Sequence, residues 1–298
     1  MIGFLNVIKP TGITSHDLIS KIRKLAGIKK VGHAGTLDPL AQGVMVVALG
    51  SATRLIQYVP GDKTYLADML LGLRTDTDDT QGKTLEKVDD LSHLSVEQIE
   101  RSLLRFSGKQ QQIPPIYSAI KQGGMKMYEL ARRGEAPSEL KARSVEIYSI
   151  DPISIEPPSV SVRVRCSKGT YIRSIARDLG AQLGVGGCLA GLVREQSGLF
   201  RIDASHTLAS LTELKEQGKL DEALIDPHKA IGLPLFTIDL ETARKLAHGQ
   251  SVSALPEAKD YELFMVGMKG SPVAIALMKR QEDGSLRPEV VLRHAAEL

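Results

Sequence analysis

One carboxylate lies in a stretch of the chain whose composition could give it a chemical role. Asp38 belongs to residues 32–43, GHAGTLDPLAQG, which contain three glycines and one proline. Glycine adopts backbone conformations that other residues avoid, and Pro39 disfavours a helical conformation for Asp38. A carboxylate held in this way, just before the apolar residues 44–49, could act on a substrate. The simpler alternative is a tight turn in which Asp38 only accepts hydrogen bonds from backbone amides.

Two acidic or glycine-containing segments resemble ion-binding loops but lack required residues. Residues 82–84, Gly-Lys-Thr, match the end of a phosphate-binding loop, which needs a glycine at position 77, where Thr77 stands. The acidic residues 76–79 would suit a calcium loop, which needs a glycine and a glutamate where Gln81 and Lys87 stand. We therefore interpret residues 76–79 as a solvated acidic loop.

Other common catalytic patterns are also missing from the sequence. The seven histidines include no pair at metal-ligand spacing with a third ligand nearby, so we predict no metal site. Neither Ser167 nor Ser174 has the Gly-x-Ser-x-Gly setting of a hydrolase nucleophile. Asp38 is therefore left as the strongest candidate for a reactive group.

The composition places limits on the class of protein. The chain has 298 residues, of which 42% are hydrophobic and 24% charged, as in soluble globular proteins, and it could form one large domain or two smaller ones. Its longest apolar run, residues 44–49, is far shorter than the roughly 20 residues that span a bilayer, and the first residues do not resemble a signal peptide. The two cysteines, Cys166 and Cys188, fit a reducing compartment. We expect a cytoplasmic protein.

The distribution of charge is more informative than the total. The net charge of +3, from 38 basic and 35 acidic residues, does not by itself predict a nucleic-acid partner. Basic residues gather in three stretches, which would suit a polyanion lying across one side of the protein. These stretches contain Lys21, Arg23, Lys24, Lys29 and Lys30, then Lys121, Lys126, Arg132, Arg133, Lys141 and Arg143, and finally Arg163, Arg165, Lys168, Arg173 and Arg177.

The segments around Asp38 predict the elements that hold its loop. Residues 4–8 indicate a strand, and Thr14 with Asp17 forms a capping box for a helix that ends at Gly27. After the loop we expect a strand over residues 44–49, a short helix near 52–58 and a strand over 64–71.

The following residues alternate between regular and irregular patterns. Ser95 and Gln98 cap a helix that stops near Gly108, and residues 110–143 carry loop signals apart from a helical pattern at 127–133. Strands are expected at 145–155 and, with alternating apolar residues, at 160–166. A helix follows residues 168–170 and is broken at 184–187. After a boundary near 226–234 we expect a capped helix and strands at 263–268, 273–278 and 290–293.

Five motifs together resemble the TruB family of bacterial tRNA pseudouridine-55 synthases. The run 32–43 resembles the signature loop of this family, and the other four occur in the family's order over most of residues 4–201. They are KPTGITS at 9–15, KTY at 63–65 with the strand that ends at Gly72, IPPIYSAIK at 113–121, and CSKGTYIRS at 166–174. Residues from about 233 resemble an RNA-binding module of the PUA type.

The resemblance implies a fold and a reaction. The fold class is α+β, with a mixed, mainly antiparallel central sheet, flanking helices and a small C-terminal PUA-like β-barrel. The implied domains are residues 1–230, with a mobile RNA-gripping insertion at 110–143, and residues 233–298. The implied activity isomerises uridine 55 in the T-arm of tRNA to pseudouridine on a flipped-out nucleotide, with tRNA-folding chaperone activity. No cofactor, metal or membrane is implied, and we expect a monomer whose partner is tRNA.

The resemblance also assigns roles to individual residues. Asp38 matches the catalytic carboxylate, which could attack the ribose, add to the base or remove a proton from the sugar. Tyr65 matches the tyrosine that stacks on the target base, and Arg173 matches the arginine that pairs with the carboxylate. Tyr171 matches a tyrosine of the active site, and Leu192 matches an apolar residue that packs beside the base. His33 matches the histidine that fills the space left by extruded nucleotides, and Lys9 would contact phosphate or support the loop. Gly35, Thr36 and Lys121 would bind substrate.

Some residues depart from the family pattern, and other functions compete. Ala34, Met45 and the pair Val193 and Arg194 differ from residues common in the family, which affects fit and RNA contact more than catalysis. The alternatives are a non-catalytic RNA binder or chaperone, a related synthase for another uridine or another RNA, and a nucleoside hydrolase, for which a second carboxylate is not evident.

Overall fold

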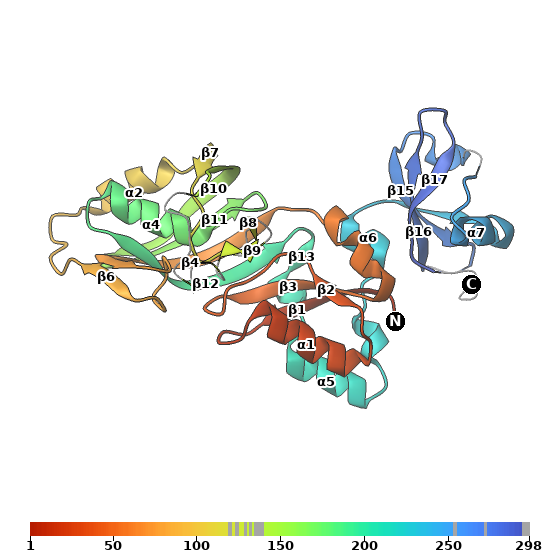
Figure 1. Ribbon diagram of the computed structural model, residues 1–298, viewed down its shortest axis with the longest axis horizontal. Coiled ribbons are helices and arrows are strands. Elements are labelled where there is room, and N and C mark those ends of the chain that lie inside the picture. Colours follow the sequence, from red (N-terminus) through yellow and green to blue (C-terminus); the bar gives the residue numbers. More distant parts are fainter. Residues whose placement is uncertain are drawn as a thin grey trace. The chain divides into compact units, whose positions relative to one another are not determined.

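The computed structural model describes residues 1–118, 121–122, 125–127, 130, 133, 140–252, 255–270 and 273–293 (Figure 1). The chain divides into two compact units. The first comprises residues 1–39, 43–60 and 197–298, and the second comprises residues 40–42 and 61–196. In the described part of the chain, no helix has the length and apolar character needed to cross a membrane.

The described residues include a sheet of nine strands. Four of these strands belong to the first unit and five to the second. The strands of the first unit are β1 (Gly3–Lys9), β2 (Val31–His33), β3 (Gln42–Leu49) and the short β13 (Phe200–Arg201). β3 pairs antiparallel with β1, from Gly3 opposite Leu49 to Lys9 opposite Gly43, and also antiparallel with β2. The apolar side chains of β3 are all buried, as are those of β1 apart from the partly buried Ile8.

Both helices predicted between residues 14 and 58 are present in the first unit. Helix α1 (Ser15–Ala26) begins at the predicted capping box of Thr14 and Asp17 and ends at Gly27, whose φ of 66° is the left-handed conformation that glycine tolerates. The short helix predicted near 52–58 is the 3-10 helix η1 (Gly50–Tyr58). The remaining helical segments of this part of the chain are η2 (Ile202–Ala204), α5 (Leu208–Glu216), η3 (Leu220–Ala223) and α6 (Pro227–Ile231).

The second unit contains five strands of the same sheet in the order β12-β4-β11-β10-β7. Their bounds are β4 (Lys63–Leu71), β7 (Gly108–Gln112), β10 (Arg143–Glu156), β11 (Ser159–Cys166) and β12 (Gly187–Ser197). The pairings of β11 with β4 and β10, and of β10 with β7, are antiparallel. In β11 the predicted alternation is confirmed, because Val160, Val162, Val164 and Cys166 are all buried.

Helices α2 (Val96–Leu104) and α4 (Ile172–Gln182) pack against β10 and β4 respectively and contact each other. The predicted cap of Ser95 and Gln98 opens α2. The prediction of a loop from residue 110 onward is wrong for its first residues, because residues 110–112 belong to β7. Their polar side chains hid a strand whose backbone pairs with β10. Two small hairpins complete the unit, β5 (Leu73–Thr75) with β6 (Thr84–Lys87) and β8 (Lys121–Gln122) with β9 (Met125–Lys126).

Part of the predicted insertion at residues 110–143 lies outside the described residues. Residues 119–120, 123–124, 128–129, 131–132 and 134–139 belong to this excluded part. The mobility of the insertion and its grip on RNA, like the helical pattern at 127–133, therefore stay predictions.

The C-terminal residues form a four-stranded sheet in the order β14-β15-β16-β17. Its elements are β14 (Leu235–Ile238), α7 (Leu240–Ala247), η4 (Pro256–Ala258), β15 (Leu263–Met268), β16 (Ala274–Arg280) and β17 (Leu286–Val291). The predicted capped helix and three strands are present, while β14 was not predicted. Leu246, Phe264 and Leu286 belong to a buried cluster between α7 and this sheet.

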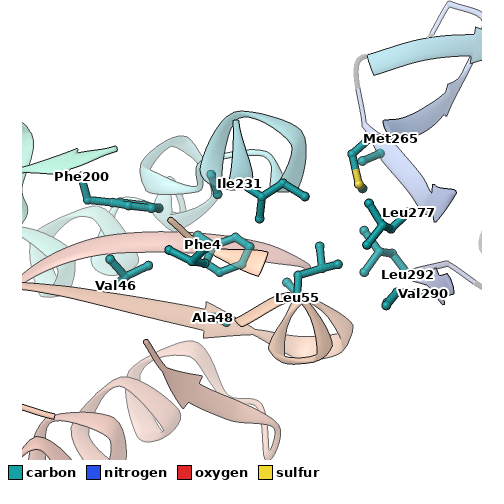
Figure 2. Close-up of a cluster of buried hydrophobic side chains, with 14 of the residues drawn as sticks. Phe4, Val46, Ala48, Leu55, Phe200, Ile231, Met265, Leu277, Val290 and Leu292 are labelled. Atoms are coloured by element: carbon teal, nitrogen blue, oxygen red, sulfur yellow. The ribbon is translucent and has the colours of Figure 1, made fainter. Parts of the chain in front are cut away.

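A second cluster joins the C-terminal strands to the N-terminal strands within the first unit (Figure 2). Phe4 and Leu55 belong to this cluster together with Leu277 and Leu292, and all four are buried. The Ser51 hydroxyl donates a hydrogen bond of 2.6 Å to the carbonyl of Leu292. The predicted functional division into residues 1–230 and 233–298 stays a prediction, and the packing adds that the two segments share a core.

Candidate active site

The loop that carries Asp38 is fastened to helix α1 on its N-terminal side. The hydroxyl of Ser15 accepts a hydrogen bond from the backbone N–H of Leu37 and donates one to its carbonyl, both at 2.8 Å. Ser15 is the first residue of α1, so the capping box at Thr14 fixes its position. Both Ser15 and Leu37 are buried, and the peptide unit that precedes Asp38 is therefore held in one orientation.

The loop is fastened on its C-terminal side as well. The backbone N–H of Gly12 donates a 2.9 Å hydrogen bond to the carbonyl of Pro39. At the N-terminal end of the loop, the N–H of Ala34 donates one of the same length to the carbonyl of Val46 in β3. Asp38 itself is half-buried between these fixed points. The backbone geometry thus favours a carboxylate that is directed by its surroundings rather than one on a mobile surface turn.

Lys9 supports the turn that approaches this loop. Its side chain is fully buried, and its ammonium group donates hydrogen bonds of 2.7 and 2.8 Å to the carbonyls of Pro10 and Ile13. Of the two roles expected for Lys9, this geometry favours support of the loop over contact with a phosphate.

The other predicted residues of the loop are accessible to different degrees. His33 ends β2, lies opposite Val47 and is half-buried, whereas Gly35 and Thr36 are exposed. Gly35 has a φ of 98°, a conformation that strains other residues, so this position requires glycine. The exposed backbone at 35–36 offers a close approach for a substrate next to Asp38.

The second unit holds the predicted aromatic and apolar residues in its sheet. Tyr65 lies in β4 opposite Val164 and is 8% exposed, and Leu192 in β12 is also 8% exposed. Lys121 lies in β8 with its backbone paired to Lys126, while its side chain is outside the described residues.

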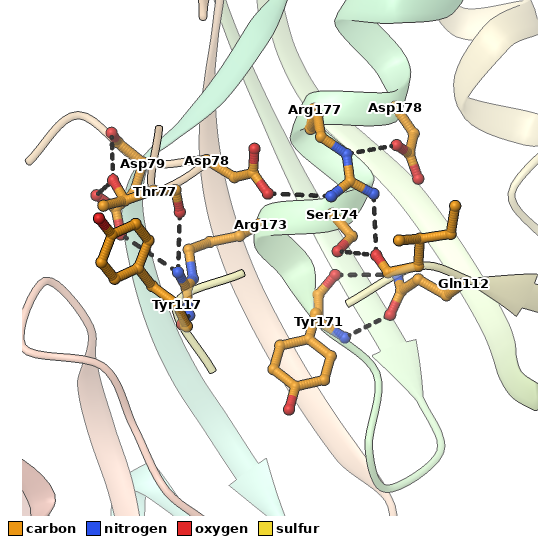
Figure 3. A network of polar contacts seen from close by, with 11 residues as sticks. Thr77, Asp78, Asp79, Gln112, Tyr117, Tyr171, Arg173, Ser174, Arg177 and Asp178 are labelled. Atoms are coloured by element: carbon orange, nitrogen blue, oxygen red, sulfur yellow. Dashed lines mark hydrogen bonds and ion pairs between the residues drawn. The ribbon is translucent and has the colours of Figure 1, made fainter. Parts of the chain in front are cut away.

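Tyr171 and Arg173 stand together at the start of α4 (Figure 3). Arg173 is 5% exposed, and its guanidinium donates hydrogen bonds to the carbonyls of Thr77 at 2.9 Å and Tyr117 at 2.8 Å. The same group lies 3.9 Å from a carboxylate oxygen of Asp79. The guanidinium is therefore fixed by two carbonyls and a buried carboxylate, in a geometry suited to presenting a cation to an anionic group.

The interpretation of residues 76–79 as a solvated acidic loop is wrong for two of its members. Asp79 is 7% exposed and accepts hydrogen bonds from the Thr77 hydroxyl at 2.7 Å and the Gln81 N–H at 3.1 Å. Asp78 lies 3.0 Å from the Arg177 guanidinium, and burial raises the pKa of its carboxyl although Arg177 opposes that shift. Thr75, Thr77 and the acidic residues alternate in sequence, a pattern in which hydroxyls can satisfy buried carboxylates and backbone groups.

The third basic stretch is also less available to a polyanion than its composition suggested. Arg163 pairs with Glu195 at 2.8 Å, Arg165 lies 3.8 Å from Asp62, and Arg177 pairs with both Asp78 and Asp178. These arginines are neutralised within the chain. The first basic stretch differs, since its four lysines are exposed at the end of α1 and beyond it.

The structure brings the predicted residues together in two groups. Asp38 shares its loop with His33, Gly35 and Thr36 in the first unit, and Tyr171 and Arg173 share the first turn of α4 in the second. The pairing of Asp38 with Arg173 joins residues of different units and stays a prediction. Sequence reasoning missed Ser15, Asp79 and Gln112, which hold these groups in place. No set of three potential metal ligands gathers among the described side chains.

Comparisons with known proteins find a family model, relatives and a solved structure that are similar to this chain. Residues 23–172 match the family model of the TruB family pseudouridylate synthase N-terminal domain. A tRNA pseudouridine synthase B of Gloeothece citriformis is 44% identical over 98% of this chain and 97% of its own, and one of Dehalococcoides mccartyi is 40% identical over 98% and 96%. In a crystal structure of a Cbf5-Nop10-Gar1 complex, a chain with 28% identity matches 99% of this chain and 86% of its own with a TM-score of 0.72.

Proposed function

The chain belongs to the TruB family of pseudouridylate synthases, and from this premise we propose that it isomerises uridine 55 in the T-arm of tRNA. As a tRNA pseudouridine synthase it is an isomerase. The observation that carries the proposal is the Asp38 loop, whose sequence matches the family signature and whose backbone is fixed on both sides of the carboxylate. The implied α+β fold is confirmed in its central nine-stranded sheet and its separate C-terminal sheet.

The reaction changes the connectivity of the nucleotide but not its elemental composition. The bond between ribose C1′ and N1 of uracil breaks, the base turns, and C1′ forms a new bond to C5. The proton on C5 is lost to solvent or a protein base, and N1 gains a proton. Attack on the ribose, addition to the base and removal of a sugar proton all require an ionised carboxylate within bonding distance of the nucleotide, the role we assign to Asp38.

The other matched residues support this step. The target base must leave its stack, which costs a few kcal/mol, and stacking on an aromatic ring such as Tyr65 returns about 1–3 kcal/mol. We assign to Arg173 the pairing with the Asp38 carboxylate, and to Tyr171 and Leu192 the shaping of the pocket around the base. His33 with Gly35 and Thr36 receives the displaced nucleotides.

We also assign RNA contact to the C-terminal residues 233–298. Their four-stranded sheet supports the predicted resemblance to a PUA-type module. A module that touches the tRNA outside the T-arm would supply sequence-independent phosphate contacts, while the loop of the T-arm supplies specificity. A tRNA-folding chaperone activity would use the same contacts and would not require Asp38.

The test uses unmodified tRNA transcripts labelled with tritium at C5 of uridine. We expect stoichiometric release of tritium from wild-type tRNA and none from a transcript with cytidine at position 55. Release from both transcripts would indicate another uridine. Free uracil in the products would indicate a hydrolase, and tight binding without release would indicate an RNA binder.

A further inference from the structure

The amide of Gln112 is matched to the backbone of Tyr171 through two hydrogen bonds. Its carbonyl accepts from the Tyr171 N–H at 2.8 Å, and its NH₂ donates to the Tyr171 carbonyl at 3.0 Å. Gln112 ends β7 and is 5% exposed. Tyr171 precedes the first turn of α4 and its own side chain provides no cap, so Gln112 supplies this end of the helix with a cap from another element.

The residues after Gln112 are fastened to the same turn of α4 (Figure 3). The carbonyl of Ile113 accepts hydrogen bonds from the Ser174 hydroxyl and the Arg177 guanidinium, both at 2.9 Å. The carbonyl of Tyr117 accepts the bond from Arg173 at 2.8 Å. Ile113 is 52% exposed while Pro114 and Pro115 are buried, so hydrogen bonds to backbone carbonyls and the packing of the two prolines hold this segment together. Residues 112–117, near the start of the predicted RNA-gripping insertion, are thus attached to α4.

We propose that Gln112 is a positioning residue for the isomerisation, which orients Tyr171 and Arg173 and ties them to the base of the insertion. The inference rests on the roles proposed above for Tyr171 and Arg173. Two parallel hydrogen bonds to one residue fix both its position and its rotation. Without them the first turn of α4 can tilt, and a displacement of about 1 Å at a catalytic group lowers a rate by roughly 100-fold.

Gln98 provides a matched control outside the predicted insertion. Its side-chain carbonyl accepts a 2.9 Å hydrogen bond from the Ser95 N–H at the start of α2, as that of Gln112 does from Tyr171 at the start of α4. In full-length protein, we expect Gln112→Ala to lower kcat for tRNA pseudouridylation by roughly 10- to 100-fold while KM changes by less than about threefold. Gln98→Ala should leave kcat within about twofold of wild type, because its lost hydrogen bond does not reach Tyr171.

A second variant tests the inference through pH. In Gln112→Glu, the ionised carboxylate accepts from the Tyr171 N–H but cannot donate to its carbonyl, whereas the protonated acid can do both. Burial favours protonation, so the rate relative to wild type should recover at least about fivefold as the pH falls from 8 to 5.5. Gln98→Glu should show no such recovery.

The outcomes separate this inference from the proposed function. If the wild-type protein forms no pseudouridine in tRNA, the proposed function fails and the inference fails with it. If the wild type is active, equal kcat values for Gln112→Ala and Gln98→Ala overturn the inference alone. A pH-independent defect of Gln112→Glu overturns it as well, and this result decides the matter if Gln112→Ala does not fold.

Discussion

At the scale of single residues, the chain places charged groups where the backbone around them is already fixed. Asp38 follows a peptide unit held by the Ser15 hydroxyl and precedes a carbonyl held by the Gly12 N–H. Arg173 is held by two carbonyls and lies near Asp79. Charges positioned in advance lose little energy to reorganisation during a reaction. This explains why serine, glycine and backbone carbonyls surround the proposed catalytic residues.

Lys63 makes a prediction about stability at this scale. It is half-buried at the start of β4, and burial together with the nearby Arg194 lowers the pKa of its ammonium group to about 8. In the unfolded chain the pKa of Lys63 is about 10.4. Between about pH 8 and about pH 10.4 the unfolded chain therefore binds more protons at Lys63 than the folded protein does. This difference makes the free energy of unfolding rise with pH. We expect that rise to be at most about 3 kcal/mol and to be absent in Lys63→Met, as measured by urea unfolding at several pH values.

The control for Lys63 is an exposed lysine. Lys109 lies on the surface of β7, and Lys109→Met should retain the wild-type dependence of the free energy of unfolding on pH. If the free energy of unfolding depends on pH equally in Lys63→Met and Lys109→Met, then Lys63 does not cause its rise with pH.

At the scale of elements, helix α4, which carries Arg173 in its first turn, packs close to the start of β12. Gly180 permits this approach, because a Cβ atom at that position would lie 2.1 Å from the backbone of Gly186 and Gly187. The N–H groups of Val185 and Gly186 also donate to the carbonyl of Gly180. The close contact is made by backbone, which cannot move aside as a flexible side chain can.

Gly180→Ala should therefore destabilise the protein. Forcing a methyl group into this contact shifts α4 and should lower the free energy of unfolding in urea by about 3 kcal/mol, the upper end of typical overpacking costs. Gln182→Ala, at an exposed position on the same helix, should change it by no more than about 0.5 kcal/mol. Equal effects of the two substitutions would contradict the close packing of α4.

Elements with a local signal could be predicted from the sequence, and those defined by distant partners could not. The caps at Thr14 and Ser95 and the alternation in β11 depend on residues a few positions apart, and the structure confirms them. The strand at 110–112 has only polar side chains, and its identity comes from pairing with β10. The burial of Asp79 likewise depends on Arg173, almost a hundred residues away, which no local pattern shows.

At the scale of the whole molecule, the proposed catalytic residues are divided between the two compact units. Asp38 belongs to the first unit, and Tyr65, Tyr171 and Arg173 belong to the second. The first unit also includes the C-terminal strands, through the core that contains Phe4 and Leu277. The order of the motifs in the sequence could predict this machinery through resemblance to a family, but composition alone could not, since the net charge is only +3.

The most direct test of the account compares wild type with Asp38→Asn, which keeps the shape of the side chain and removes its charge. Tritium release from 5-tritiated tRNA is measured in a single turnover, together with the Kd for the same tRNA. The account predicts no release above background by Asp38→Asn, with a Kd within about threefold of wild type, because phosphate contacts dominate affinity for nucleic acid. Release by Asp38→Asn at the wild-type rate would contradict the central role of Asp38.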